Sequence, residues 1–532
     1  MKSKKNPKED PASSAEVDAK SRDLRGFESE VLTPYLQGKG DHEAPADERV
    51  ARSLIPPMTA TRRSFASVAS QFPRFIAEKC VACMECVIQC PDAAIYARAN
   101  PEKDRDAALN RVEDAALKRA IGQRFVKTAK FWNVFEKKGQ TPALFSLWID
   151  PDQCKGCGEC ANVCAEHGAL TMMAKSDAEM EIARKTMEFA EKTLPQTPQA
   201  YINERLYTDL FLGEKGWIYK GGAGSCMGCG EITALKMALT ATAAKYGRDI
   251  VIVAATGCNS VFSSTYPFNI FSVPWTNSLF ENAPAVALGA RMRLNQEGKK
   301  ATKIWAVGGD GAMSDIGFQA ASRALVSGED INILVMDTQV YSNTGGQASS
   351  STFTGQSAKM SAHGKVARGK VERRKELGLI ALMHPEVFVA QVSPAYYNHF
   401  LRAVLDAVDY PGPSMVIAYS PCLPEHGIAD DLSFERAKEA VVSRAFPLFV
   451  YDPRKGKAIH ERLDLRGNPS LNQDWHQDPK IGEIHDFIKF ARGEGRFAQH
   501  FDKEGKPGPA LLVAQEDRAM NWQVLRELAG LK

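Results

Sequence analysis

Two apolar runs of this 532-residue chain each end in small and polar residues, a pattern suited to binding a phosphorylated ligand. The run 304–307 ends in Gly-Gly-Asp-Gly (308–311), and the run 331–336 ends in Asp-Thr (337–338). The segment 315–326 between them has the length of a helix, so the stretch predicts a strand–helix–strand unit. Open α/β sheets bind ligands at the carboxyl ends of such strands, which is where both polar groups fall.

The glycines and oxygen-bearing residues of this unit predict a diphosphate site with a magnesium ion. Gly309 and Gly311 allow the backbone to approach a diphosphate closely, and the helix that follows offers it N–H groups. Asp310 and Thr338 supply the hard oxygen ligands that magnesium prefers. Gly-Asp-Gly alone is usually a turn. Followed by a helix, a strand and a loop with Asn343, it resembles the motif that binds thiamine diphosphate (TPP).

Eight of the twelve cysteines form two runs with the spacing found in bacterial ferredoxins. In such a run the first three cysteines bind one cluster, and the fourth ligates the other cluster. Disulfides are not packed this way, so the pattern indicates metal binding in a reducing compartment. Two structural zinc sites are the alternative, but they need pairs of Cys-x-x-Cys rather than triplets with a fourth. The expected [4Fe–4S] sets are Cys80, Cys83, Cys86 with Cys164, and Cys154, Cys157, Cys160 with Cys90.

The remaining four cysteines could form a third set. Cys226 and Cys229 form one Cys-x-x-Cys before a predicted helix, and Cys258 and Cys422 each follow a predicted strand. The strand ends place them at the same sheet edge as the diphosphate site. A single cysteine at such a position is more often an inert buried thiol. Because the two ferredoxin sets leave these four and no others, we expect a third [4Fe–4S] cluster, with Cys229 and Cys258 nearest to TPP.

Composition and charge exclude several classes of protein. Hydrophobic residues make up 44% of the chain and charged residues 25%, as in ordinary globular proteins. The formal net charge of +3 gives no reason to expect nucleic acid as a partner. No apolar run reaches the roughly 18 residues needed to span a membrane, and the N-terminus lacks the apolar segment of a secretory signal. We therefore expect a cytoplasmic protein of two or three domains.

Further motifs occur in a fixed order along the chain and identify a resemblance. They are Cys-Met-Gly-Cys-Gly-Glu (226–231), Gly-Cys-Asn-Ser (257–260), Asn-Ser-Leu-Phe-Glu (277–281), Val-Tyr-Ser-Asn-Thr-Gly-Gly-Gln (340–347) and Ala-Tyr-Ser-Pro-Cys (418–422). Together with the ferredoxin runs and Gly-Gly-Asp-Gly, the series resembles the C-terminal portion of pyruvate:ferredoxin oxidoreductase. The resemblance implies oxidative decarboxylation of pyruvate to acetyl-CoA and CO2, or the reverse carboxylation. Coenzyme A would be the co-substrate, and electrons would pass through three clusters to ferredoxin or flavodoxin.

The expected fold is α/β, with five segments in order. Residues 1–70 form an N-terminal tail or a partner-binding arm, and 71–175 form a two-cluster ferredoxin-like α+β domain. A linker, 176–215, leads to a doubly wound TPP-binding domain, 216–450, which has a mainly parallel sheet and carries the third cluster. Residues 451–532 form a C-terminal extension that packs on the TPP domain or on the partner.

The resemblance also implies a partner. Single-chain members of the family begin with a pyrimidine-binding domain, whose glutamate activates the cofactor, and with domains that help to bind coenzyme A. The residues before Phe72 leave no room for these domains. We therefore expect one subunit of a split enzyme, active only with a partner subunit, in a hetero-oligomer with two copies of each chain.

The resemblance assigns roles to individual residues of the diphosphate site. The magnesium ligands would be the side chains of Asp310 and Thr338 and the carbonyl of Val340. Gly309, Gly311 and Asn343 would line the diphosphate, and Asn343 would also face the substrate as the catalytic residue. His363 and His426 are expected to be solvated loop histidines. The basic run 365–375 is expected to be a solvated helix face, with an acidic partner as the alternative.

Two other functions remain open from the sequence. The first is the same chemistry on another 2-oxo acid, such as 2-oxoglutarate, oxalate, or a branched-chain or aryl 2-oxo acid. The second is an electron-transfer or scaffold subunit whose TPP domain is not catalytic. The loss of Asp310, Thr338 or Asn343 would favour the second function, and all three residues are present.

Overall fold

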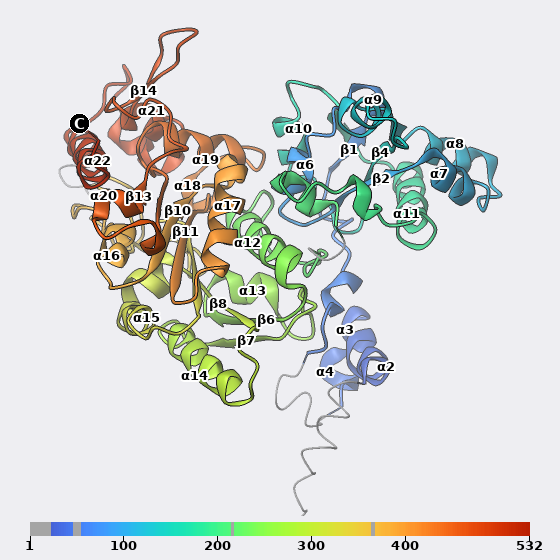
Figure 1. Ribbon diagram of the computed structural model, residues 1–532, viewed down its shortest axis with the longest axis horizontal. Helices are drawn as coiled ribbons and strands as arrows, with labels where there is room; N and C mark the ends of the chain where they lie inside the picture. Colours follow the sequence, from blue (N-terminus) through green and yellow to red (C-terminus); the bar gives the residue numbers. More distant parts are fainter. Residues whose placement is uncertain (1–22, 46–54, 214–216, 363–367, 532) are drawn as a thin grey trace, which may run out of the picture.

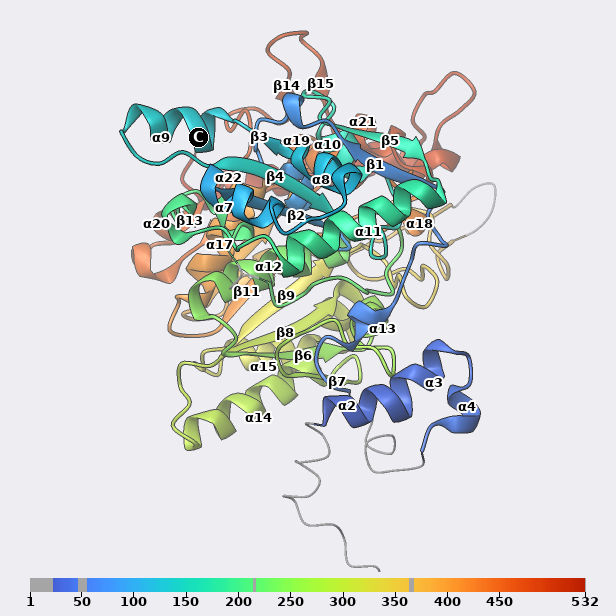
Figure 2. The same cartoon turned by 90° about the vertical axis from the view of Figure 1, so that its right-hand side faces the viewer.

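The computed structural model describes residues 23–45, 55–213, 217–362 and 368–531. A large α/β lobe lies beside a smaller lobe (Figure 1). A short helical segment from the N-terminal part of the chain lies below the smaller lobe in both views, level with the lower part of the large lobe (Figure 1 and Figure 2). Among the described helices, none is both long and apolar enough to cross a lipid bilayer.

The large lobe is built, within the described residues, on an eight-stranded sheet in the order β13-β12-β10-β11-β9-β8-β6-β7. Strands from β10 to β7 pair in parallel, whereas β12 and β13 extend one edge in the antiparallel sense. This confirms the predicted α/β fold with a mainly parallel sheet. The strands are β6 (Ile250–Ala255), β7 (Trp275–Ser278), β8 (Lys303–Gly309), β9 (Asn332–Asp337), β10 (Phe388–Val392), β11 (Ser414–Tyr419), β12 (Phe449–Tyr451) and β13 (Leu463–Asp464).

The central strands read as continuous apolar runs because helices cover both faces of the sheet. Side chains alternate along β8: Trp305 and Val307 enter one core, and Ile304 and Ala306 enter the other. The first core is covered by α12 (Gly230–Tyr246) and α17 (Tyr397–Val408). The second core is covered by α14 (Ala283–Gln296), α15 (Phe318–Leu325), α16 (Leu377–Leu382) and α19 (Ser433–Val442).

The smaller lobe has the plan expected for a ferredoxin-like domain. Its first and last strands, β1 (Gln71–Phe75) and β5 (Leu170–Ala174), pair in the antiparallel sense. The strands β2 (Ile95–Asn100) and β4 (Leu144–Ile149) form a second antiparallel pair, which β3 (Phe125–Val126) extends. Each cysteine run therefore connects a strand of one pair to a strand of the other. Residues 80–90 lie between β1 and β2, and residues 154–164 lie between β4 and β5. The helices α6 (Glu85–Gln89) and α10 (Glu159–Val163), one from each run, contact each other.

Two further segments complete the smaller lobe. Between the cysteine runs lie α7 (Glu102–Leu109), α8 (Ala115–Gly122), the π-helix Ala129–Asn133 and α9 (Val134–Lys137). The expected linker 176–215 begins with a full helix, α11 (Asp177–Lys192). This helix packs on β4, with the rings of Phe189 and Trp148 5.8 Å apart. The helix therefore belongs structurally to the smaller lobe.

The N-terminal segment is helical where the structure describes it. It consists of α2 (Leu24–Phe27), a π-helical turn (Glu28–Leu32), α3 (Thr33–Leu36) and α4 (Gly40–Glu43). Phe27 and Tyr35 pack edge-on against Tyr266 of the large lobe, with ring centroids 6.3 and 5.8 Å away. Residues 1–22 and 46–54 of the predicted tail lie outside the described residues. The described part contacts the large lobe of the same chain.

The C-terminal extension packs on the large lobe, one of the two predicted positions. It contains α20 (Ile459–Arg462), β14 (His476–Gln477), β15 (Ile484–His485), α21 (Phe487–Arg492) and α22 (Pro509–Leu528). Phe487, Phe490 and Phe497 surround the ring of Phe353, at centroid distances of 5.5 to 6.4 Å. Phe353 belongs to the segment that follows the predicted diphosphate loop, so the extension packs against this segment.

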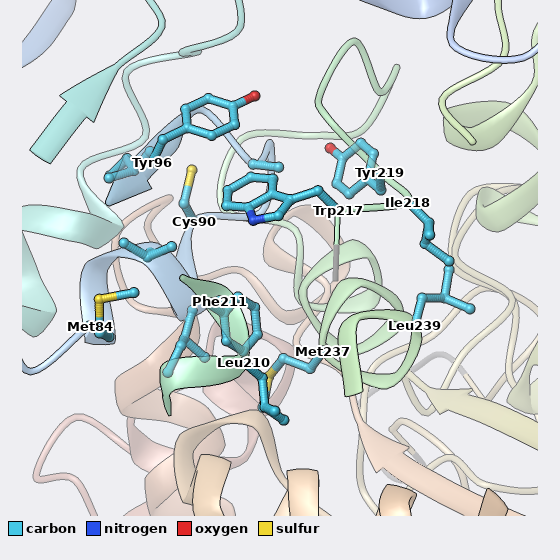
Figure 3. Packing of buried hydrophobic residues seen from close by; sticks show 14 of the residues in the cluster. Met84, Cys90, Tyr96, Leu210, Phe211, Trp217, Ile218, Tyr219, Met237 and Leu239 are labelled. Carbon is cyan, nitrogen blue, oxygen red and sulfur yellow. The ribbon is translucent and has the colours of Figure 1, made fainter. Parts of the chain in front are cut away.

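A continuous apolar seam joins the two lobes. Figure 3 shows Met84, Cys90 and Tyr96 of the smaller lobe on one side of this seam and Met237 and Leu239 of α12 on the other. Side chains of the connecting segment, including Phe211 and Tyr219, fill the space between them. The cysteine runs and the sheet therefore share one core.

The basic run was predicted wrongly. Its described part, residues 368–375, contains no helix, and Lys370 and Arg374 are only 7% exposed. Lys370 donates to the carbonyl of Thr352 at 2.9 Å, and Arg374 forms a buried ion pair with Asp337. The reason is that these two side chains point inward, toward carbonyl oxygens of residues 350–352 and the Asp337 carboxylate at the end of β9, while Arg373 points outward.

We expect Arg374→Met to destabilise the large lobe by about 3–5 kcal/mol, because Asp337 would keep a buried charge without its partner. Arg373→Met is the matched control: Arg373 is 59% exposed, and its loss should change stability by less than about 0.5 kcal/mol. Urea and thermal unfolding, followed by circular dichroism under anaerobic conditions, measure both variants. Equal destabilisation by the two would contradict a structural role for the Arg374–Asp337 pair.

Candidate functional site

Four strand ends meet at one edge of the large sheet, as predicted. Asp310 follows β8 and Thr338 follows β9, and these strands are neighbours with Gly309 opposite Met336. Cys258 lies just after β6, and Cys422 lies just after β11. The parallel arrangement of all four strands brings oxygen ligands and thiols to the same edge.

The three groups predicted to hold magnesium converge. The Thr338 hydroxyl donates to Asp310 Oδ1 at 3.1 Å and lies 3.0 Å from the Val340 carbonyl. The Thr338 N–H and the Ser349 hydroxyl also donate to Asp310, at 3.1 and 2.5 Å. Burial and the Asp337 carboxylate raise the pKa of Asp310 to about 7. A divalent cation would relieve this unfavourable burial of charge, so this donor set fits magnesium.

A cavity opens beside these oxygens and has the lining expected of a diphosphate site. A Cβ atom at position 311 would lie 2.4 Å from the ring of Tyr341, so only glycine fits beside this ring. The predicted residues Gly309, Gly311, Thr338, Val340 and Asn343 all line the cavity. They are joined there by Glu231, Thr256, Gly257, Cys258, Phe280, Ala312, Tyr341, Ser342 and Thr344.

Glu231 is a site residue that the sequence interpretation missed. It is 5% exposed, and within the described structure its Oε2 atom has no hydrogen-bond partner. Burial and the nearby Asp310 raise its pKa to about 8. A buried carboxyl group that faces a cavity without a partner is suited to hydrogen-bond a ligand. Its place in the first turn of a helix, right after Cys229-Gly230, is the signal that could have identified it.

His426 was also predicted wrongly, as a solvated histidine. It is fully buried, and its Nε2 atom lies 2.9 Å from the Thr338 carbonyl. The short helix α18 (Leu423–His426) turns back over the sheet edge and places the imidazole there. Burial lowers the pKa of His426 well below its usual value, so the ring is neutral. His363 lies outside the described residues.

The C-terminal extension supports the same loop. Arg496 is fully buried and pairs with Glu494 at 2.6 Å. Its Nη1 atom donates to Gln339 Oε1 at 3.0 Å and to Gln356 Oε1 at 3.2 Å. Gln339 lies between Thr338 and Val340 and has a left-handed backbone conformation, with φ of 58°. The extension therefore helps to hold the residue between two of the predicted magnesium ligands.

The two ferredoxin sets gather as the spacing predicts. One cavity is lined by Cys80, Cys83, Cys86 and Cys164, and another by Cys90, Cys154, Cys157 and Cys160. Each cavity thus takes its fourth cysteine from the other run. Burial and neighbouring thiolates raise the pKa of Cys86 and of Cys160 well above the usual value. Four thiolates in such a place are stable only with a positively charged centre, so the residues fit iron–sulfur clusters.

The third cysteine set gathers at the start of α12. Gly230 donates to the Pro421 carbonyl at 3.1 Å, which holds Cys229 beside the Cys422 loop. A Cβ atom at position 230 would lie 2.6 Å from the Pro421 nitrogen, so glycine is needed for this approach. Burial raises the pKa of Cys258, and the nearby Glu231 carboxylate and the three other cysteines of the set raise it further. Cys258 also lines the diphosphate cavity, which places this set against the predicted TPP site.

Comparison with known proteins agrees with the predicted family resemblance and with the fold of the large lobe. Residues 255–418 match the family described as "Thiamine pyrophosphate enzyme, C-terminal TPP binding domain". A pyruvate-flavodoxin oxidoreductase of Rhodospirillum rubrum is 30% identical over 95% of this chain and 45% of its own length. The chain is thus similar to a pyruvate oxidoreductase over almost all of its length. The resemblance predicted from the motifs and the predicted TPP-binding fold are thereby confirmed.

Other relatives carry related names. A pyruvate:ferredoxin oxidoreductase of Moorella thermoacetica is 30% identical over 80% of this chain and 40% of its own length. A probable pyruvate-flavodoxin oxidoreductase of Escherichia coli is 29% identical over 83% of this chain and 41% of its own. The chain thus spans less than half the length of these pyruvate oxidoreductases. A solved 2-oxoglutarate:ferredoxin oxidoreductase from Magnetococcus marinus, 21% identical over 42% of this chain and 73% of its own, has a TM-score of only 0.36.

We expect Asp310→Asn to weaken the binding of TPP with magnesium by at least about 100-fold, since even the partners of metal ligands contribute roughly 10- to 100-fold. The amide keeps the volume of Asp310 but loses its charge. Isothermal titration with TPP and magnesium measures the change, and Asp330→Asn at the opposite end of the sheet is the control. Iron content should stay at the parent value. Unchanged TPP affinity in Asp310→Asn would contradict the magnesium assignment.

We expect anaerobically purified protein to contain about twelve irons per chain, roughly four in each of three clusters. Cys80→Ser and Cys164→Ser should perturb the same electron paramagnetic resonance (EPR) signal, and Cys90→Ser and Cys154→Ser should perturb the other ferredoxin-type signal. Loss of one shared signal in Cys154→Ser and Cys164→Ser would show that each run closes its own cluster.

Proposed function

We propose that this chain is the TPP-binding and electron-transferring subunit of a 2-oxoacid oxidoreductase that acts on pyruvate. The products would be acetyl-CoA and CO2, with ferredoxin or flavodoxin as electron acceptor, or the reaction would run in the carboxylating direction. The observation that carries this proposal is the shared position of Cys258. This residue belongs to the third cysteine set and also lines the predicted diphosphate cavity.

The chemistry follows from the two kinds of site placed together. Bound TPP supplies a carbon nucleophile and electron sink for decarboxylating a 2-oxo acid, and iron–sulfur clusters accept electrons one at a time. Asp310, Thr338 and Val340 would hold the magnesium ion of the diphosphate. Asn343 would face the substrate from the cavity wall, and Phe280 and Tyr341 would limit the access of water.

The substrate assignment rests on the named relatives, which are pyruvate oxidoreductases. Another 2-oxo acid remains the second candidate substrate. An electron-transfer subunit with a non-catalytic TPP domain is less well supported, because Asp310, Thr338 and Asn343 all line one cavity or its metal site.

A partner subunit should complete the site, and the surface supports this part of the proposal. Leu279, Ile316 and Met360 are 61%, 51% and 88% exposed. Leu279 adjoins the cavity residue Phe280, and Ile316 ends the π-helix that begins at Gly311. Leu279 and Ile316 thus lie next to the ligand site, and exposed apolar side chains in such a place indicate an interaction surface. The occupant would be the subunit with the pyrimidine- and coenzyme A-binding domains, in a particle with two copies of each chain.

We expect the chain alone to be inactive with pyruvate, coenzyme A and a viologen acceptor, and to become active when the partner subunit is added. Leu279→Glu should weaken this reconstitution at least about tenfold, because it puts a charge into the apolar contact. Met292→Glu, at a 53% exposed site on α14, is the matched control and should have no effect. Full activity of the chain without a partner would contradict the split-subunit proposal.

A further inference from the structure

Lys236 is a buried lysine whose ammonium group hydrogen-bonds to backbone carbonyls of the first cysteine run. It lies on α12 and is 4% exposed. Its Nζ atom donates to the carbonyls of Val87, at 2.9 Å, and of Cys90. Within the described structure it forms no ion pair with Asp or Glu. Burying an ammonium group without an anionic partner costs free energy. We therefore expect a negatively charged group other than a carboxylate near Lys236.

The neighbours of Lys236 are cysteines of both ferredoxin sets. Val87 lies in α6, the helix that contains Cys86, and Cys90 follows the end of this helix. Cys86 belongs to the set with Cys80, whereas Cys90 belongs to the set with Cys154. The ammonium group therefore lies at the segment that joins the two sets, and it contacts Cys90 itself. A cluster with four thiolates is an anion and gains a further negative charge when it accepts an electron.

A second buried lysine nearby serves as a comparison. Lys155 follows Cys154, and its Nζ atom lies 2.6 Å from Asp92 Oδ1. Both side chains are almost fully buried, so the pair is close to neutral. Lys155 also donates to the Ser225 carbonyl, at 2.7 Å, and thereby ties the second ferredoxin set to the loop of Cys226. Of the two lysines, Lys155 has a carboxylate in direct contact, whereas Asp92 acts on Lys236 only at longer range, together with Cys90 and Cys86.

Lys236 also comes from the opposite lobe. Its helix starts just after Cys229 of the third set and carries Glu231 in the diphosphate cavity. Lys236 is seven positions after Cys229, which is about 10.5 Å along the axis of an α-helix. The seam that α12 crosses is packed with Phe211, whose ring centroid is 6.0 Å from the Lys236 Nζ atom. The helix α12 therefore joins the third cysteine set, at its start, to both ferredoxin sets, which it contacts through the buried side chain of Lys236.

We propose that Lys236 tunes electron transfer: its charge, supplied by the TPP lobe, raises the reduction potential of the cluster held by Cys90, Cys154, Cys157 and Cys160. The effect on the cluster held by Cys86 is smaller, because the ammonium group contacts Cys90 directly. The inference rests on the proposed function, since it requires the ferredoxin-type clusters. In the proposed transfer of single electrons from the third set toward the acceptor, the positive charge of Lys236 would stabilise the reduced form of this cluster.

The test is an EPR-monitored redox titration of the purified holoprotein with its clusters intact. Lys236→Met and Lys236→Gln both remove the charge, and glutamine keeps a donor for the Val87 carbonyl. Each should lower the equilibrium constant for reduction of this cluster by about tenfold, which is 59 mV toward negative potential for a one-electron couple. Lys236→Arg should restore the parent potential, and Lys245→Met, on the exposed end of the same helix, should leave it unchanged.

Several results would overturn the proposal. Parent potentials in both uncharged variants with full iron content would show that the charge of Lys236 is immaterial. A parent potential in Lys236→Gln together with a shift in Lys236→Met would assign the effect to hydrogen bonding. A larger shift in the reduction potential of the cluster held by Cys86 would show that the charge acts mainly on that cluster, contrary to the proposal. A parent protein without two ferredoxin-type signals would instead contradict the proposed function itself.

Discussion

The burial of negative charge is the constraint on which the rest of this structure depends. Asp310 is completely buried, Asp337 is 1% exposed, and three sets of thiols lie in or near the same interior. Water cannot screen these groups, so positive charge has to be built in or bound. Arg374 balances Asp337, and Lys155 balances Asp92. The raised pKa values of Asp310 and Glu231 indicate where the chain itself leaves negative charge uncompensated.

The parallel sheet brings the residues of the candidate site to one place. Four strands that end at one edge bring together residues from β6, β8, β9 and β11, which are spread over more than a hundred positions in the sequence. The helix α12 adds Cys229 and Glu231 from the same direction because Gly230 lets its first turn approach Pro421. The close approach at this one glycine thus brings the third cysteine set up to the cavity that Glu231 lines.

The sequence predicts those parts of the site in which the spacing of residues is itself the physical requirement. Cluster-binding runs, the Gly-Asp-Gly turn and the apolar strands follow local rules, and the predicted residues lie where these rules place them. His426, Arg374 and Glu231 were missed or predicted wrongly because their surroundings come from distant segments. A histidine after a strand carries no local sign that its ring will meet the Thr338 carbonyl. The inward turn of Lys370 and Arg374 likewise depends on the loop 349–356 that covers them.

The contact between Arg496 and Gln339 has a consequence for the order in which the protein is made. The two residues are 157 positions apart, so the loop 338–340 leaves the ribosome long before the guanidinium group that supports it. A nascent chain that ends before residue 496 has the sheet edge and its glycines but lacks this support for the left-handed Gln339. The conformation of the loop therefore depends on a segment that is synthesised much later than the loop itself.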